Sequence, residues 1–153
     1  LGAILQQSGK TNDARALFLK AAQMRARKAA DLAQTAHDLA VDGKLPEAAA
    51  GFVEALTLQP DNPELRNTYA TVLARQGDFN AAVAQFDLAI EARPDYAKAH
   101  FNRAMALQEL GDFKNALAGY LKANELAPEW KEPQLQIESL SKQNQEPPQA
   151  NQR

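Results

Sequence analysis

Acid–base chemistry in this sequence would depend on two histidines, His37 and His100, because the chain of 153 residues contains no cysteine. Imidazole changes its charge near neutral pH and is also a common metal ligand. The two histidines are far apart in the sequence and form no His-x-x-x-His pair. The sequence also lacks a glycine-rich phosphate loop and a serine elbow. We therefore expect no catalytic residue, no metal site and no cofactor.

The composition narrows the class of protein further. Hydrophobic residues make up 45% of the chain and charged residues 24%, which is typical of a chain that folds. The net charge of −2 argues against bulk nucleic acid as the main partner. No apolar run approaches the roughly 20 residues that a membrane-spanning helix needs. We expect a protein that neither binds nucleic acid nor inserts into a membrane.

A repeat decides the organisation of the chain. Four glycines recur every 34 residues, at Gly9, Gly43, Gly77 and Gly111. Five further columns of small, leucine and aromatic residues keep the same spacing, and in the third copy they are Ala70, Leu73, Ala82, Phe86 and Ala89. A fixed period of this length indicates an array of supersecondary units that stack on one another.

Each unit predicts an antiparallel pair of helices. Ala70 and Leu73 have the spacing of one helical face. Gly77 can adopt the left-handed conformation that ends a helix, and Asp78 suits the start of the next one. Phe86 is expected to fill the space between neighbouring units. A single hairpin cannot bury such a face alone, so the units must stack.

This pattern resembles the tetratricopeptide repeat family. The residues that carry the resemblance are Ala70, Leu73, Gly77, Phe79, Ala82, Phe86, Ala89 and Pro94. One column departs from the motif, because the early first-helix position holds Leu32, Arg66 and His100 and only the leucine fits. The resemblance implies an all-α fold, a right-handed superhelical solenoid of antiparallel helix pairs with a C-terminal capping helix.

The repeat boundaries follow from the register. We expect a partial repeat at 1–28, full repeats at 29–62, 63–96 and 97–130, a capping helix at 131–142 and a disordered tail at 143–153. The capping helix should place Leu135, Ile137 and Leu140 on its apolar side, with Trp130 packed beneath it. We expect His100 to be a packed residue of the first helix.

The junction between the first two units has two interpretations. Ala26 replaces the proline that stops the other second helices, and residues 23–28 are all acceptable helix formers. Residues 12–41 could therefore form one continuous helix. The preserved 34-residue register favours a kinked turn instead, and this is the interpretation we prefer from the sequence.

The resemblance also implies a ligand site. In this family the first helices line a concave groove, and their outward-facing positions are the candidate residues for binding a peptide. Amides there can hydrogen-bond both groups of an extended backbone, and Arg75 or Lys98 could hold a carboxylate. Phe101 and Met105 would form a small apolar spot. The candidate residues are Gln34, His37, Asn67, Thr68, Thr71, Arg75, Lys98, Phe101, Asn102 and Met105.

Two sharper forms of this hypothesis fit poorly. Family members that bind chaperone tails carry a carboxylate clamp of Lys, Asn, Asn, Lys and Arg, and an asparagine ladder marks the sugar-transferring members. Only Lys98 agrees with the clamp, whose matching positions are Ala33, His37, Thr68, Lys98 and Asn102. The ladder positions read Gln34, Thr68 and Asn102, so this pattern is also incomplete.

Charge is divided unevenly along the chain. Residues 1–28 contain six basic residues and one acidic residue, whereas residues 29–128 contain eight basic and fourteen acidic residues. The basic segment is expected to complement an acidic neighbour. The chain starts with Leu1 in a helical pattern, so we expect it to begin inside a longer protein. A cytoplasmic location is favoured, with an upstream signal peptide left open.

The sequence therefore predicts a non-catalytic scaffold that binds a protein or an extended peptide in its concave groove. One alternative is a targeting arm of a larger enzyme, such as a glycosyltransferase-type protein, with its catalytic domain upstream of residue 1. A second alternative is a structural module that self-associates through the cut N-terminal face.

Overall fold

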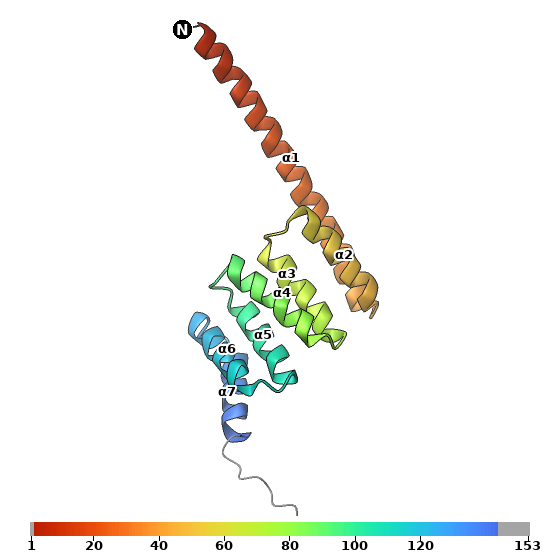
Figure 1. The fold of residues 1–153 in the computed structure, drawn as a ribbon, viewed down its shortest axis with the longest axis vertical. Coiled ribbons are helices and arrows are strands. Elements are labelled where there is room, and N and C mark those ends of the chain that lie inside the picture. The colour runs from red at the N-terminus through yellow and green to blue at the C-terminus, as the bar shows by residue number, and fades with distance from the viewer. Residues whose placement is uncertain (1, 144–153) are drawn as a thin grey trace, which may run out of the picture. The chain divides into compact units, whose positions relative to one another are not determined.

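The computed structural model describes residues 2–143 of the chain, and the side chains of residues 13–142. This part of the chain contains helices and no strand. Two compact units divide it near Pro60. The first contains α1 (Gly2–Val41) and α2 (Leu45–Leu58). The second contains α3 (Pro63–Arg75), α4 (Phe79–Ala92), α5 (Ala97–Glu109), α6 (Phe113–Leu126) and α7 (Lys131–Gln143) (Figure 1).

The helix boundaries follow the expected turn chemistry. Gly43, Gly77 and Gly111 have φ values of 79° to 85°, the left-handed region in which glycine costs least. Asp78 accepts a hydrogen bond from the backbone N–H of Ala81 at 3.0 Å, and so caps α4. These local signals confirm the predicted hairpins α3–α4 and α5–α6.

The repeated spacing of alanine and aromatic residues forms the buried stripe of each second helix. In α4 the stripe is Ala82, Phe86 and Ala89, and of these Ala82 and Phe86 pack with Ala70 and Leu73 of α3 and Ala106 of α5. The equivalent stripes of α2 and α6 are also buried, and they contain Ala48, Phe52, Ala55, Ala116, Tyr120 and Ala123. The predicted all-α architecture of antiparallel helix pairs is confirmed.

Two glycines bring paired helices unusually close together. A Cβ atom on Gly119 of α6 would lie 2.9 Å from the Cβ of Ala104 and 3.2 Å from the carbonyl oxygen of His100. A Cβ atom on Gly51 of α2 would lie 2.9 Å from the Cβ of Ala36. At this contact a side chain of any size would push the two helices apart. The repeat pattern does not predict the requirement, because the third equivalent position holds Gln85.

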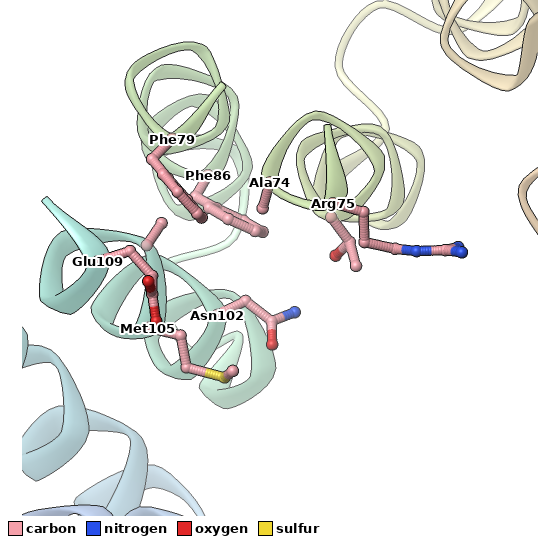
Figure 2. Close-up of a pocket in the computed structure, with 9 residues that line it drawn as sticks. Ala74, Arg75, Phe79, Phe86, Asn102, Met105 and Glu109 are labelled. Carbon is pink, nitrogen blue, oxygen red and sulfur yellow. The ribbon is translucent and has the colours of Figure 1, made fainter. Parts of the chain in front are cut away.

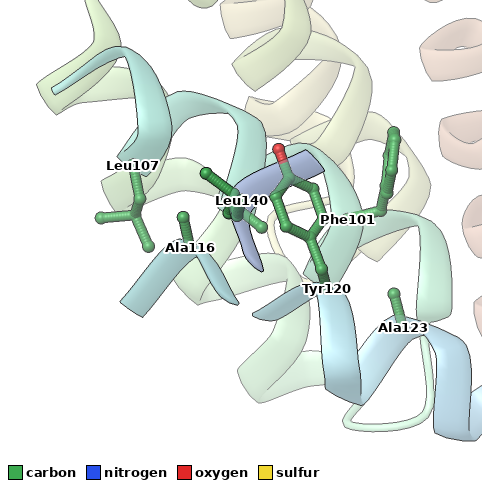
Figure 3. Close-up of a cluster of buried hydrophobic side chains, with 7 residues drawn as sticks. Phe101, Leu107, Ala116, Tyr120, Ala123 and Leu140 are labelled. Atoms are coloured by element: carbon green, nitrogen blue, oxygen red, sulfur yellow. The ribbon is translucent and has the colours of Figure 1, made fainter. Parts of the chain in front are cut away.

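The C-terminal helix α7 covers the last hairpin, as predicted. Leu140 is buried with Phe101 and Tyr120, and Ile137 and Trp130 pack against the same cluster (Figure 3). The expectation for Leu135 is wrong, because its side chain is 60% exposed. Pro133 is buried instead, since it lies seven residues before Leu140 and therefore on the same helical face.

The first helix differs from the expected arrangement. α1 runs without interruption from Gly2 to Val41, so the kinked turn is wrong and the continuous helix is correct. Gly9 lies within this helix and does not end it, in contrast to the glycines at 43, 77 and 111. A single glycine costs a helix about 1 kcal/mol, and no proline at Ala26 reinforces the break. Residues 2–28 therefore form no separate hairpin.

The predicted tail at 143–153 lies outside the described residues, apart from Gln143 at the end of α7. Although α1 has 40 residues, neither it nor any other helix in the described part has an apolar stretch able to cross a bilayer.

Candidate functional site

The second unit contains a cavity of about 310 Å³ between α3, α4 and α5 (Figure 2). Phe79 and Phe86 of α4 form its apolar wall, and Met105 of α5 lies on the opposite side. Met105 is 47% exposed, so the cavity is accessible from solvent. The complete set of lining residues is Thr71, Ala74, Arg75, Phe79, Phe86, Asn102, Met105, Ala106 and Glu109. We call this cavity the α3–α5 pocket.

Four of the predicted site residues line the α3–α5 pocket: Thr71, Arg75, Asn102 and Met105. They come together because positions three and four residues apart lie on one side of each helix. Phe86 was predicted from the sequence as a packing residue, and Phe79 was noted only as a residue of the repeat motif. Both lie on the second helix of the repeat, whereas the predicted site residues lie on the first helices.

Asn67 and Asn102 form a direct link between neighbouring repeats. The Nδ2 of Asn102 donates a hydrogen bond to the Oδ1 of Asn67 at 3.0 Å. Asn67 is only 4% exposed, so its amide is not offered to a ligand as the sequence suggested. Asn102 is half-buried and keeps a second N–H and its own Oδ1 beside the pocket.

The threonines satisfy their hydroxyl groups locally. Thr71 donates to the carbonyl oxygen of Asn67, and Thr68 donates to that of Glu64, both at 2.9 Å. Such bonds to the preceding turn hold each methyl group in one orientation. Thr71 therefore presents a fixed side chain to the pocket, whereas Thr68 does not line it.

Phe101 does not form an apolar spot with Met105, so that expectation is wrong. Its ring lies 5.4 Å from the ring of Tyr120 and 4.7 Å from that of Trp130, between centroids. Only 9% of Phe101 is exposed. The residue lies three positions before Ala104 and so shares the core face of α5.

The remaining candidates are exposed and are not brought into the pocket. Lys98 lies in the first turn of α5. Gln34 and His37 lie on α1 in the other unit, and Gln34 donates to the carboxylate of Asp38 at 2.9 Å. His100, by contrast, is half-buried with its Nε2 2.9 Å from the carbonyl oxygen of Pro94, in keeping with a packing role.

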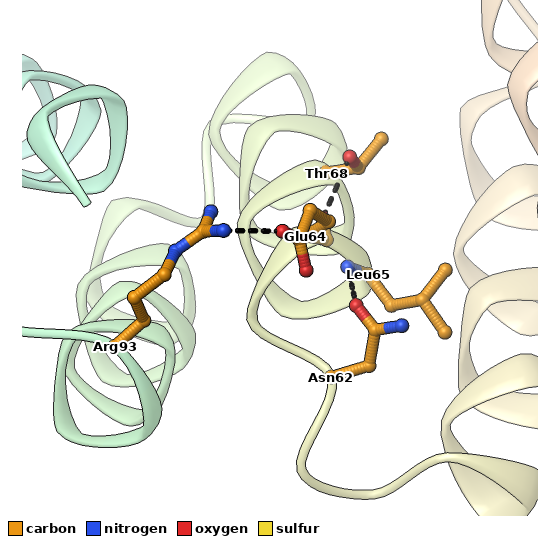
Figure 4. A network of polar contacts seen from close by, with 5 residues as sticks. All are labelled: Asn62, Glu64, Leu65, Thr68 and Arg93. Atoms are coloured by element: carbon orange, nitrogen blue, oxygen red, sulfur yellow. Dashed lines mark hydrogen bonds and ion pairs between the residues drawn. The ribbon is translucent and has the colours of Figure 1, made fainter.

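A polar network anchors the start of α3, the helix that carries Thr71 and Arg75 (Figure 4). Asn62 caps this helix by accepting the N–H of Leu65 at 3.0 Å. Arg93 lies just beyond α4 and forms an ion pair with Glu64, with 2.5 Å between its Nη1 and the Oε1 of Glu64. The Cζ of its guanidinium lies 3.7 Å from the centroid of the Tyr96 ring. These contacts fix one end of α3 relative to the end of α4.

Charged side chains lie at the border of the pocket. Arg75 ends α3, Glu109 ends α5, and both are exposed. Neither makes an ion pair with any residue that the structure describes. A guanidinium in this position is able to bind a carboxylate with two parallel hydrogen bonds.

Titratable groups with shifted pKa values lie outside the pocket lining. Burial raises the pKa of the Tyr120 hydroxyl to about 12, and the nearby Glu109 carboxylate adds to the shift. This hydroxyl donates to the Oε1 of Gln108 at 2.8 Å. Burial also raises the pKa of Tyr96. Within the described part of the chain, no three His, Asp or Glu residues converge as metal ligands would.

Comparison with known families agrees with the helix pairs. Sequence profiles described as tetratricopeptide repeats match residues 39–100 and 97–130. The chain belongs to the tetratricopeptide repeat family. No sequence among curated proteins matches it.

Solved tetratricopeptide repeat domains share this fold. The first such domain of Spaghetti (RPAP3), bound to the HSP90 peptide SRMEEVD, is 25% identical with a TM-score of 0.76, over 79% of this chain and 96% of that one. The Arabidopsis OM64 domain is 19% identical with a TM-score of 0.75, over 78% and 98%. The Sgt2 domain of Aspergillus fumigatus is 20% identical with a TM-score of 0.74, over 82% and 89%. The last two comparisons concern the fold alone.

Proposed function

We propose that this tetratricopeptide repeat array binds an extended peptide and inserts one apolar side chain of that peptide into the α3–α5 pocket. The observation that carries the proposal is the pocket itself, which is open to solvent and has two phenylalanines in its wall. A volume of about 310 Å³ is at the small end of the range for ligand pockets, roughly 300–1,000 Å³. Such a space suits a side chain of a peptide and not a folded domain.

Polar groups beside the pocket supply the orientation of the bound peptide. Asn102 is held by Asn67 and offers a donor and an acceptor for one peptide unit. Arg75 has no intramolecular ion-pair partner in the described residues, so it is free to bind an acidic side chain or a C-terminal carboxylate. The preferred ligand therefore carries a large apolar residue close to an acidic group.

The similarity to the Spaghetti domain supports a peptide ligand but not the same one. That domain is bound to a peptide of HSP90. Among the five clamp positions of this chain, only Lys98 matches the pattern for chaperone tails. We propose that the ligand is held by the apolar pocket and not by a carboxylate clamp, and that the array binds without catalysing a reaction.

Fluorescence anisotropy with an array of labelled heptapeptides tests the proposal, with SRMEEVD as one of the probes. We expect the best ligands to contain Leu or Phe next to Asp or Glu, and SRMEEVD, which has only Met and Val next to acidic residues, to bind more weakly. Met105→Glu should weaken binding of the best peptide at least tenfold, because it places a charge in the pocket, opposite the apolar wall.

Leu88→Glu is the matched control, because Leu88 is an exposed apolar residue of α4 that does not line the pocket. This variant should change the affinity less than twofold. Equal binding by wild type and Met105→Glu would exclude the pocket as the site. Preferred binding of SRMEEVD would show that the chain recognises the chaperone tail in another way.

A further inference from the structure

An unpartnered apolar surface lies on the N-terminal part of α1, far from the α3–α5 pocket in the sequence. Leu17, Phe18, Leu19 and Met24 are each more than half exposed, and Phe18 is 76% exposed. α2 lies alongside the C-terminal part of α1, where Ala29, Ala36 and Ala40 are buried (Figure 1). Residues 13–25 are exposed throughout.

The spacing of this surface matches the buried stripes of the other repeats. Ala14, Phe18 and Ala21 occupy the same three columns as Ala82, Phe86 and Ala89, and all three are exposed. Each aligned stripe in α2, α4 and α6 is at most 1% exposed. We call Ala14, Phe18 and Ala21 the open stripe.

The covered stripes show what kind of partner fits the open stripe. In the second unit, the α4 stripe packs on α3 through a small residue and a leucine three positions apart, Ala70 and Leu73. The α6 stripe packs on α5 through Ala104 and Leu107 in the same way. The preceding segment at residues 2–9 and the next first helix at residues 29–41 cannot fold back over the open stripe, because both are parts of the same continuous helix α1.

Basic residues beside the open stripe indicate the charge of the partner. Arg15 lines a shallow hollow with Ala14, Phe18, Leu19 and Ala22, and Arg25 lies one turn beyond Ala21 on the same side of the helix. Residues 14–28 contain five basic residues and no acidic residue, so two copies packed on each other's open stripe would bring like charges together, which is unfavourable. An acidic helix would instead pair with both arginines.

We propose that the open stripe is the docking site for an acidic amphipathic helix of a partner protein, which packs antiparallel to α1. The apolar face of this helix carries a small residue and a leucine three positions apart. It supplies in trans the cover that α3 and α5 give to the stripes of α4 and α6. This interaction is independent of the peptide proposed for the α3–α5 pocket.

The probe is a fluorescein-labelled peptide with the sequence of residues 63–76, in which Arg66→Glu and Arg75→Glu make it acidic. Alanine and glutamate should extend it to about 20 residues, because shorter isolated helices are marginal in water. We expect saturable binding by anisotropy and at least tenfold weaker binding to Phe18→Asp. The peptide with Leu73→Lys should also bind at least tenfold more weakly.

Ala16→Asp is the matched control, because Ala16 is exposed on the opposite side of α1. Ala16→Asp should change the affinity for the helical peptide less than twofold. Met105→Glu should also change this affinity less than twofold, because Met105 lines the α3–α5 pocket and not the open stripe. Thermal unfolding of each variant should match wild type, since Phe18 and Ala16 pack against nothing in the described chain. Equal binding by wild type and Phe18→Asp would overturn the proposal. A dimer of the wild-type chain in sedimentation equilibrium that is absent in Phe18→Asp would also overturn the proposal, because a second copy would then cover the open stripe.

Discussion

The side-chain amides of Asn67 and Asn102 are joined by a hydrogen bond of 3.0 Å between the first helices of two successive repeats. Asn67 is buried, and its Oδ1 would lose this partner if Asn102 were truncated. An unsatisfied buried acceptor costs about 1–3 kcal/mol. Asn67, which the sequence predicted as a ligand-binding residue, therefore positions the side chain of Asn102 instead.

A double-mutant cycle measures this link. Asn67→Ala and Asn102→Ala should each lower the free energy of unfolding by about 1–2 kcal/mol in urea titrations. The double variant should lose less than the sum, with a coupling of about 1 kcal/mol. Additive losses would show that the amides act independently. Asn67→Ala should also weaken peptide binding, because it frees Asn102 to rotate away from the pocket.

Phe18 and Phe86 occupy one repeat column but differ completely in environment, and this gives a second prediction. Phe86→Ala should cost roughly 3–5 kcal/mol, because Phe86 is 1% exposed and its removal leaves a hole. Phe18→Ala should stay within about 0.5 kcal/mol, as is usual for an exposed residue. Denaturant titration of both variants tests the continuous α1. A large cost for Phe18→Ala would mean that residues 1–28 fold as a packed hairpin.

Gly119 provides a third prediction, in which packing opposes helix propensity. Alanine stabilises a helix interior by about 1 kcal/mol relative to glycine. The contact of 2.9 Å with the Cβ of Ala104 should outweigh this gain, so Gly119→Ala should be destabilising by about 1 kcal/mol. Adding Ala104→Gly removes the clash, so the double variant should be less destabilised than the two single losses added together. A stabilised Gly119→Ala variant would contradict the close approach of α5 and α6.

The buried hydroxyl of Tyr120 predicts a loss of stability at alkaline pH. Its pKa is raised to about 12 in the folded chain, against the usual 10. The unfolded chain therefore releases this proton first, and the free energy of unfolding should fall as the pH rises above about 10. The Tyr120→Phe variant removes this contribution, so its stability should decline less steeply between pH 10 and 12. Identical slopes for both proteins would show that Tyr120 titrates normally.

The repeat register and the turn residues were sufficient to predict most of the fold. Glycine at 43, 77 and 111 ends a helix through its own backbone conformation, and Asp78 caps the next helix locally. The stripe with Phe86 forms one apolar face because its spacing matches one side of a helix. These features depend on residues close in sequence, so the sequence by itself determined the hairpins, the apolar face of each helix and the capping helix α7.

Tertiary contacts decided the rest. The sequence placed Asn67 and Phe101 among the outward-facing positions, but packing with neighbouring helices buries both. The same packing makes Phe79 and Phe86 the wall of a pocket that the first helices alone do not contain. Phe18 has the right column and the right neighbours in sequence, yet it stays exposed. A repeat motif specifies which face of a helix is apolar, and burial of that face requires a second helix to cover it.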